Sequence, residues 1–212
     1  MKTLPCLVAL LALLPLAGCT RPPAPQGLSY QTTAQAGEAL RVAVLPFWLG
    51  DRVGRTAQGV SDQFAASLRT LGRHEVINVT PERRRTLLPD DALAANRLST
   101  DALVRIREAL QVDAVILGRI EQFDSFDPPV LGLTVHLVSC LDGEVLWSAT
   151  AHLDGGRQDV QDDLQWWNDH QNGDGNRSLA GWRLALSSPA TFARYASDRL
   201  VETIPYTEDG QK

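Results

Sequence analysis

Three predicted strands, separated by helical patterns, dominate the first half of the chain. Residues 41–47 (RVAVLPF) and 113–120 (DAVILGRI) contain unbroken apolar runs, and residues 74–79 (HEVINV) form the strand between them. Unbroken apolar runs of this length are typical of strands that are buried on both faces of a sheet. Between them, apolar residues recur at helical spacing over residues 60–71 and again over residues 99–110, where Ser99 is placed to cap the helix. Strands that alternate with helices predict an α/β layer architecture with right-handed crossovers.

A β-hairpin is predicted over residues 130–153. Apolar and polar residues alternate along both arms, so each arm has one apolar and one polar face. A two-residue turn at Asp142 would set core positions opposite solvent positions. We therefore expect a three-residue loop that ends with Gly143 in a left-handed conformation, and that pairs Val135 with Ala149 and Ser139 with Val145.

After Leu153 the periodicity is lost until Ser188 and Pro189 begin a final helix, whose apolar stripe should pack against the sheet. We predict an α/β (α+β) domain with a mixed sheet of about five strands and a C-terminal helix. Three parallel-type strands with crossover helices come first, and the antiparallel hairpin follows. This single domain should span residues 39–206, with 154–187 as a long loop and 207–212 as a disordered tail.

The N-terminus has the layout of an export signal. A basic start precedes an apolar run over residues 4–16, which is too short for a full transmembrane helix. Residues 16–19 (LAGC) resemble the lipobox of bacterial lipoproteins. The resemblance implies that residues 1–18 are removed as a signal peptide and that Cys19 is lipidated with chains such as palmitate, which would anchor the protein stably. An ordinary cleaved signal with Cys19 free is the alternative.

Residues 19–38 are rich in Pro, Gln, Thr and small residues and show no apolar period. Such a composition buries too little surface to offset its ordering entropy, so we expect a flexible tether after the lipidated cysteine. In the lipoprotein family an aspartate after the cysteine often marks retention in the inner membrane, whereas this chain has Thr20. The resemblance therefore implies a lipid-anchored protein of the outer membrane that faces the periplasm.

Composition excludes some partners and restricts the cysteines. The formal net charge of the 212 residues is −5, which argues against nucleic acid, because phosphate binding needs a basic surface. Of the 3 cysteines, Cys6 would leave with the signal and Cys19 would be lipidated. Cys140 then has no partner for a disulfide, so packing alone must stabilise the domain.

Templates for catalytic and metal sites fail on the spacing of their residues. Residues 74–78 (HEVIN) begin like a zinc-protease motif, yet Asn78 replaces the second histidine. Residues 170–175 resemble a calcium loop but lack its acidic first ligand. His136 and Cys140 share a strand face about 13 Å apart, too far for a nucleophile and its base. We therefore expect no enzyme, no metal and no cofactor.

Two groups of residues are candidates for binding. Three of the 5 tryptophans, Trp166, Trp167 and Trp182, lie in the predicted 154–187 loop and are candidate partner contacts, because loop tryptophans often anchor interfaces. The alternative is that they fold back and cover the sheet. The second group, Trp48, Asp51 and Arg52, follows the first strand, where open α/β sheets bind small ligands.

The strand sequences RVAVLPF, DAVILGRI and DGEVLWS, in this order, resemble an α/β domain shared by several envelope proteins. These are the N-terminal domain of TolB, the curli secretion lipoprotein CsgG and the penicillin-binding-protein activator LpoB. The resemblance covers about residues 41–153 and implies a non-enzymatic lipoprotein that binds another envelope protein. We therefore expect an interaction or assembly module of the cell envelope. A small-molecule or glycan carrier is the alternative, and an enzyme is a third reading.

Overall fold

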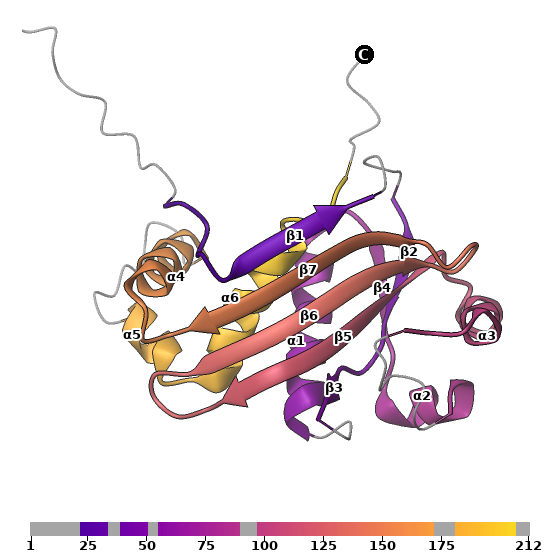
Figure 1. Cartoon of the computed structure of the whole chain (residues 1–212), viewed down its shortest axis with the longest axis horizontal. Helices are drawn as coiled ribbons and strands as arrows, with labels where there is room; N and C mark the ends of the chain where they lie inside the picture. Colours follow the sequence, from indigo (N-terminus) through magenta and orange to yellow (C-terminus); the bar gives the residue numbers. More distant parts are fainter. Residues whose placement is uncertain (1–21, 34–38, 51–54, 90–96, 172–180, 207–212) are drawn as a thin grey trace, which may run out of the picture.

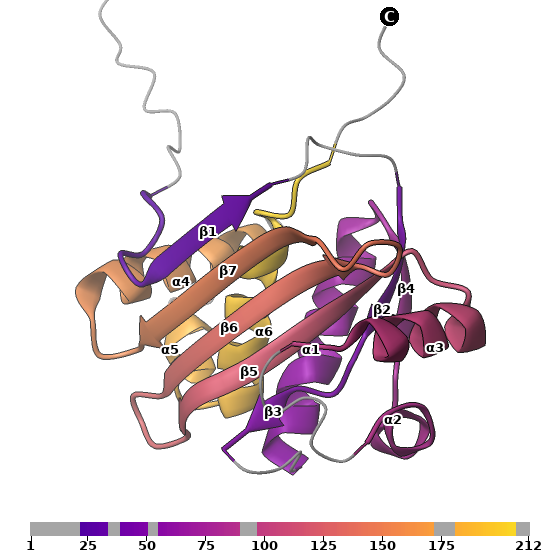
Figure 2. The same ribbon diagram turned by 45° about the vertical axis from the view of Figure 1, so that its right-hand side comes forward.

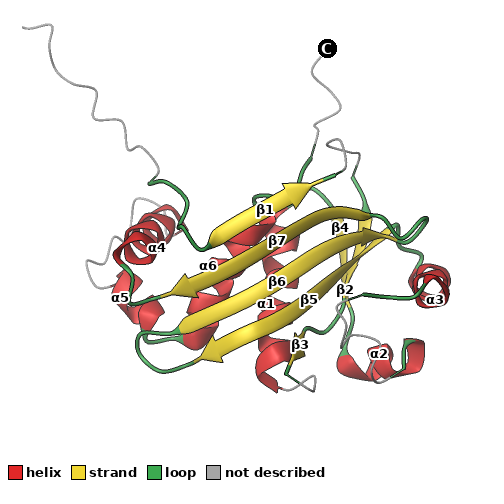
Figure 3. Cartoon of the chain, in the orientation of Figure 1, coloured by secondary structure: helices red, strands yellow, loops and turns green. Residues whose placement is uncertain are grey.

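The computed structural model describes residues 22–33, 39–50, 55–89, 97–171 and 181–206. These residues form a mixed, open sheet with helices packed against it (Figures 1 and 3). The strands are β1 (Leu28–Thr32), β2 (Arg41–Val44), β3 (Trp48–Leu49), β4 (Glu75–Asn78), β5 (Ala114–Asp124), β6 (Val130–Ser139) and β7 (Val145–Asp154). The helices are α1 (Arg55–Leu71), α2 (Pro81–Leu87), α3 (Thr100–Leu110), α4 (Gln158–Gln171), α5 (Gly181–Leu186) and α6 (Pro189–Val201).

The strand order is β1-β7-β6-β5-β2-β4, with β3 paired to β5 beside this path. Strands β4, β2 and β5 are parallel, and β5, β6, β7 and β1 follow one another in antiparallel pairs. The predicted fold class is therefore confirmed: three parallel strands with crossover helices precede an antiparallel hairpin. The expected number of about five strands was too low, because the described sheet has 7.

One of the additional strands lies in the segment that was expected to be a flexible tether. Leu28–Thr32 pairs with β7, from Leu28 opposite Ala151 to Thr32 opposite Trp147. It is an edge strand, and its burial pattern shows one half-buried residue followed by four exposed ones. Backbone hydrogen bonds rather than side-chain burial hold it in place, so composition alone did not reveal it. The expectation of a tether over the whole of 19–38 is wrong for these residues.

The two faces of the sheet are covered differently. Helices α1 and α6 pack side by side on one face and bury the larger apolar core, which includes Phe47, Phe64, Trp147 and Phe192. On the opposite face, α2 and α3 cover only the half of the sheet near β2 and β5. In Figures 1 and 2 no described helix lies over the front of β6, β7 and β1. This half of the sheet exposes its polar positions to solvent.

The predicted hairpin is confirmed in its main features and wrong in one detail. Val135 lies opposite Ala149, and Gly143 adopts a left-handed φ of 76°. Ser139, however, does not pair with Val145. The register shifts between Leu137 and Val138, so that Val138 lies opposite Val145. A bulge of this kind adds one residue to an arm and turns the connection more sharply than regular pairing allows.

Residues 154–187 were expected to form a loop, and this expectation is wrong. They contain α4 and α5 instead. Val160, Leu164 and Trp167 of α4 are buried at helical spacing, but the same buried face carries two polar residues, Asp163 and Asn168. Because polar residues interrupt the stripe, the sequence does not show a clear helical period there. The final helix α6 does begin as predicted, with Ser188 accepting a hydrogen bond from the backbone N–H of Thr191.

Candidate functional site

The three candidate tryptophans do not share an exposed surface. Trp167 is buried in α4, with 5% of its surface exposed, and its indole N–H donates to Asp198 Oδ2 at 2.9 Å. Trp166 and Trp182 are half-buried and pack against the core from α4 and α5. Trp167 therefore fits the alternative in which the tryptophans fold back and cover the sheet. Its side chain cannot reach a partner in this fold. Contact of a partner with Trp166 or Trp182 stays a prediction.

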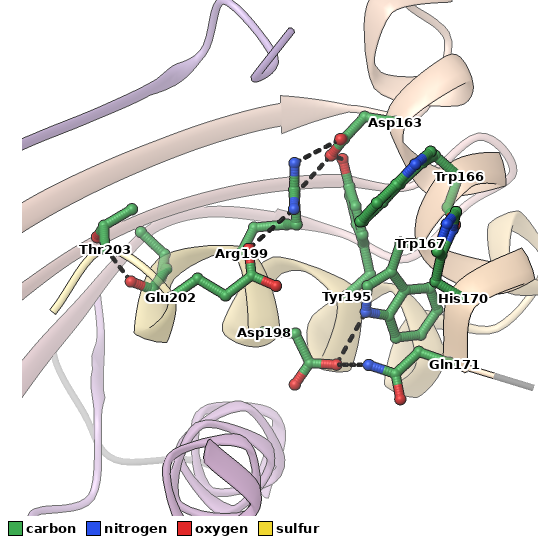
Figure 4. A network of polar contacts seen from close by, with 11 residues as sticks. Asp163, Trp166, Trp167, His170, Gln171, Tyr195, Asp198, Arg199, Glu202 and Thr203 are labelled. Atoms are coloured by element: carbon green, nitrogen blue, oxygen red, sulfur yellow. Dashed lines mark hydrogen bonds and ion pairs between the residues drawn. The ribbon is translucent and has the colours of Figure 1, made fainter. Parts of the chain in front are cut away.

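Trp167 belongs to a network of polar and aromatic contacts that joins α4 to α6 (Figure 4). At its centre, Arg199 donates from Nε to Asp163 Oδ2 at 2.8 Å and from Nη2 to Oδ1 at 2.6 Å. The Tyr195 hydroxyl donates to the same Oδ2 at 2.7 Å. Arg199 also reaches Glu202 Oε2 from Nη1 at 2.9 Å. Bidentate, charge-assisted bonds of this kind fix the relative orientation of the two helices.

The centre of the network is closed to solvent. The side chains of Arg199 and Asp163 are 3% and 0% exposed. Burial, followed by the Asp163 carboxylate, raises the pKa of Tyr195. The phenol therefore keeps its proton at every physiological pH and acts as a hydrogen-bond donor. We assign this cluster to holding the fold together rather than to chemistry on a substrate.

The loop proposed for a small ligand lies partly outside the described residues. Of its three candidate residues, Trp48 is in β3 and is 7% exposed, and its indole N–H donates to the Gly50 carbonyl at 2.6 Å. Its ring belongs to the smaller core and is not available to a ligand. Asp51 and Arg52 lie outside the described residues, as does the lipidation candidate Cys19.

A surface that the sequence did not single out is the uncovered face of β6 and β7. Ladder partners on this face are polar: Thr134 lies opposite Thr150, His136 opposite Ser148, and Gly132 opposite His152. These are the polar positions of the predicted alternation. The alternation of polar and apolar positions was therefore visible in the sequence. Which half of the sheet stays uncovered, however, depends on where α2 and α3 pack.

A cavity of about 400 Å³ opens where this face meets α3 and the β6–β7 turn. Its lining residues are Arg97, Leu98, Leu117, His136, Val138, Gly143 and Val145. Exposed apolar side chains lie on neighbouring parts of the chain: Leu141 is 73% exposed in the β6–β7 turn, Val145, which lines the cavity at the start of β7, is 40% exposed, and Val104 is 44% exposed on α3. We call this region, comprising the cavity and the side chains of Val104, Leu141 and Val145, the α3 end of the molecule.

His136 is the titratable group inside the cavity. Burial lowers its pKa, so the imidazole is neutral at pH 7. Its Nδ1 atom is buried and has no hydrogen-bond partner within the described part of the chain. A neutral ring with one nitrogen unbonded can exchange a hydrogen bond with a hydroxyl or an amide. The chemistry of the cavity therefore suits a neutral polar group beside apolar contacts.

Cys140 is buried in the smaller core. The Cys140 thiol is 3% exposed, and burial raises its pKa to about 11, so it is a poor nucleophile.

Among the described residues, no group of three or more His, Cys, Asp or Glu side chains is arranged to hold a metal ion. Within the same residues, no helix is both long enough and apolar enough to span a bilayer.

No protein-family model matches the sequence, and no curated protein matches it. Solved structures resemble the fold. The PelC dodecamer from Paraburkholderia phytofirmans aligns with a TM-score of 0.52 and 16% identity, over 85% of this chain and 98% of PelC. The lipoprotein GNA1162 from Neisseria meningitidis aligns with a TM-score of 0.43 and 16% identity, over 68% of this chain and 91% of its own.

LpoB from E. coli aligns with a TM-score of 0.39 and 14% identity, over 72% of this chain and 84% of LpoB. The TM-scores of GNA1162 and LpoB are low, so these two structures are only loosely similar to this chain. The similarity to PelC shows the fold alone, because the identity is low. The similarity to TolB and CsgG stays a prediction.

Proposed function

We propose that this chain is a lipid-anchored protein of the outer membrane, facing the periplasm, and that it acts as a non-enzymatic interaction or assembly module of the cell envelope. The LAGC sequence at residues 16–19 supports the anchor. The fold shared with PelC, which was solved as a dodecamer, supports an assembling protein. The membrane, through Cys19, and an envelope protein are then its two partners.

The observation that carries the proposal is the α3 end. Leu141, at 73% exposure, is one of the most exposed large apolar side chains among the described residues, and it lies in the β6–β7 turn, whose Gly143 lines a cavity of about 400 Å³. An apolar rim around a concave site is the arrangement that binds an anchoring side chain of a protein partner. Arg97 at the edge of the cavity adds a charge that can orient that partner.

Site-specific cross-linking in intact cells tests the proposal. A photoreactive residue at Leu141 should give a product of defined mass, because the partner covers that position. The same residue at Ala66, which is exposed on α1, is the matched control and should give none. Products at multiples of the chain mass would identify a second copy as the partner, and a single other mass would identify another envelope protein. Equal cross-linking at both positions would contradict the proposal.

The anchor is tested separately. The wild-type protein should incorporate a labelled palmitate analogue and remain with the membrane fraction after high-salt washing. Cys19→Ala should lose the label, because it removes the thiol that carries the acyl chains. Incorporation of the label by Cys19→Ala at the wild-type level would contradict lipidation at Cys19.

A small-molecule or glycan carrier is a second candidate, favoured by His136, a hydrogen-bonding side chain in the lining of the cavity. A ligand of this cavity should raise the melting temperature of the wild-type protein, because binding to the native state alone stabilises it. His136→Leu should abolish the rise by removing the hydrogen bond. A panel of neutral sugars and peptides that leaves the melting temperature unchanged would argue against this candidate.

A further inference from the structure

The segment between the lipidation candidate and the folded domain is much shorter than the sequence suggested. The Gln26 backbone N–H donates to Asp159 Oδ2 at 3.1 Å, and the Gln26 side-chain carbonyl accepts from Arg157 at 3.0 Å. The Gly27 carbonyl then accepts from the His152 N–H at 2.7 Å, and β1 follows. Only residues 20–25 separate Cys19 from this attachment, and a fully extended chain of that length spans roughly 25 Å.

Two of the most exposed apolar side chains lie at the same end of the sheet as this attachment. Phe126, in the turn between β5 and β6, is 80% exposed, and Leu184, on α5, is 67% exposed. Figures 1 and 2 place the start of β1, the β5–β6 turn, α4 and α5 on one side of the molecule, away from α3. We call this side, comprising Gln26, Phe126 and Leu184, the tether end.

Direct contacts connect these parts through the turn after β7. The Gly155 N–H donates to the Pro129 carbonyl at 2.9 Å, which ties the β5–β6 turn to the end of β7. A Cβ atom placed on Gly155 would lie 2.9 Å from Leu186 Cδ2, so α5 packs against the same turn. Arg157, two residues later, carries the contact to Gln26. These contacts join the start of β1, the β5–β6 turn and α5 at one end of the sheet.

Phe126 lies in the β5–β6 turn, and a hydrogen bond fixes its backbone there. Its backbone N–H donates to Asp124 Oδ1 at 3.0 Å, which closes a local turn around the residue. On α5, the Arg183 guanidinium lies 4.6 Å from the centre of the half-buried Trp182 ring. Apolar tips together with a Trp–Arg pair are typical of protein surfaces at the boundary between lipid headgroups and acyl chains.

We propose that the tether end docks on the membrane, with Phe126 and Leu184 inserted at the boundary between headgroups and acyl chains. The inference rests on the proposed lipidation of Cys19, whose short connection keeps the bilayer within reach of these side chains and makes the docking effectively intramolecular. Docking points the α3 end away from the membrane, where a partner can reach it. Because Asp124 and Asp127 flank Phe126, a zwitterionic lipid surface suits this end better than a strongly anionic one.

Fluorescence of labelled, lipidated full-length protein in vesicles tests the docking. Phe126→Cys and the control Leu141→Cys, at the opposite end of β6, are each labelled with nitrobenzoxadiazole. The buried Cys140 thiol, with its pKa of about 11, and the acylated Cys19 do not react. In vesicles of phosphatidylethanolamine with a minor fraction of phosphatidylglycerol, the probe at 126 should shift to the blue and be quenched several-fold by spin-labelled lipid. The probe at 141 should do neither.

The outcomes separate this inference from the anchor itself. If the protein sediments with vesicles but the probe at 126 stays in water, docking is wrong and the anchor stands. If the protein does not sediment, both are wrong. A blue shift at 126 that depends on protein concentration and occurs without vesicles would assign Phe126 to a contact with a second copy, which also overturns the inference. Both labelled variants should melt at the wild-type temperature, because positions 126 and 141 are exposed.

Discussion

Arg199 and Asp163 form a bidentate ion pair inside the protein, across the contact between α6 and α4. The Nη2–Oδ1 distance is 2.6 Å, and the two side chains are 3% and 0% exposed. The Tyr195 hydroxyl and the Glu202 carboxylate satisfy further groups of the pair. A buried ion pair adds little net stability over apolar residues of similar size, but removing one partner leaves a buried charge uncompensated. The pair therefore fixes the position of α4 relative to α6.

Asp163→Ala should lower the free energy of unfolding by about 3–5 kcal/mol, because it leaves the Arg199 guanidinium buried without its counterion. Urea unfolding at pH 7, followed by circular dichroism, measures the loss. Glu75→Ala is the matched control, since it breaks the Arg41–Glu75 pair, whose side chains are 39% and 64% exposed. That change should cost less than about 1 kcal/mol.

A double variant, Asp163→Leu with Arg199→Met, separates charge from packing. It removes both charges while it keeps apolar volume, so it should recover most of the stability that Asp163→Ala loses. If Asp163→Ala cost no more than Glu75→Ala, the buried pair would not hold α4 in place.

Trp167→Ala should lower the free energy of unfolding by about 3–5 kcal/mol, because it empties a large buried site and removes the bond to Asp198. Trp182→Ala, at a half-buried position on α5, should cost about 1–2 kcal/mol. The same urea titration measures both. A loss for Trp182→Ala as large as that for Trp167→Ala would contradict the placement of Trp167 in the core and Trp182 near the surface.

The parallel half of the fold and the hairpin could be predicted because burial left a direct record in the sequence. Strands buried on both faces give unbroken apolar runs, and a half-buried hairpin gives alternation. Helix α4 could not be predicted, because its buried face includes Asp163 and Asn168. The partners of Asp163, which are Tyr195 and Arg199, lie on α6. A buried polar residue is recognised only together with its partner, and a partner about 36 residues away leaves no local signal.

The α3 end could not be predicted from the sequence for a different reason. Its cavity is assembled from the segment before α3, from β5 and β6, and from the β6–β7 turn, so no spacing along the chain marks it. Similarly, β1 exposes four of its five residues and pairs only through its backbone. The pairing of β1 shortens the connection to Cys19, on which the proposed docking of Phe126 rests, and no motif indicated it.

Cys140 should be unreactive in the native protein. Its thiol is 3% exposed with a pKa of about 11, so at pH 8 about one thiol in a thousand is ionised, and that one is buried. An aromatic disulfide reagent should therefore modify it only as fast as the protein unfolds. Leu141→Cys, at the neighbouring position with 73% exposure, should react with its introduced thiol in seconds to minutes. Rapid modification of Cys140 in the wild-type protein without denaturant would contradict its burial.

His74 connects the start of β2 to the C-terminal segment and should make stability depend on pH. Its Nδ1 accepts the Leu40 N–H at 3.2 Å, and its ring meets Tyr206 edge-on at 6.0 Å between centroids. Burial, followed by the charge of Arg73, lowers the pKa of His74, and burial alone lowers the pKa of His136.

Because the folded pKa values lie below the unfolded value of about 6.5, the unfolded chain binds more protons in the intervening window. The free energy of unfolding should therefore rise with pH up to about 6.5 and lose this contribution as the pH falls toward the lowered values. His74→Gln and His136→Gln should each reduce the slope between pH 5 and pH 6.5. Urea titrations at several pH values measure the slope. A double variant of His74 and His136 with the wild-type slope would show that other groups cause the dependence.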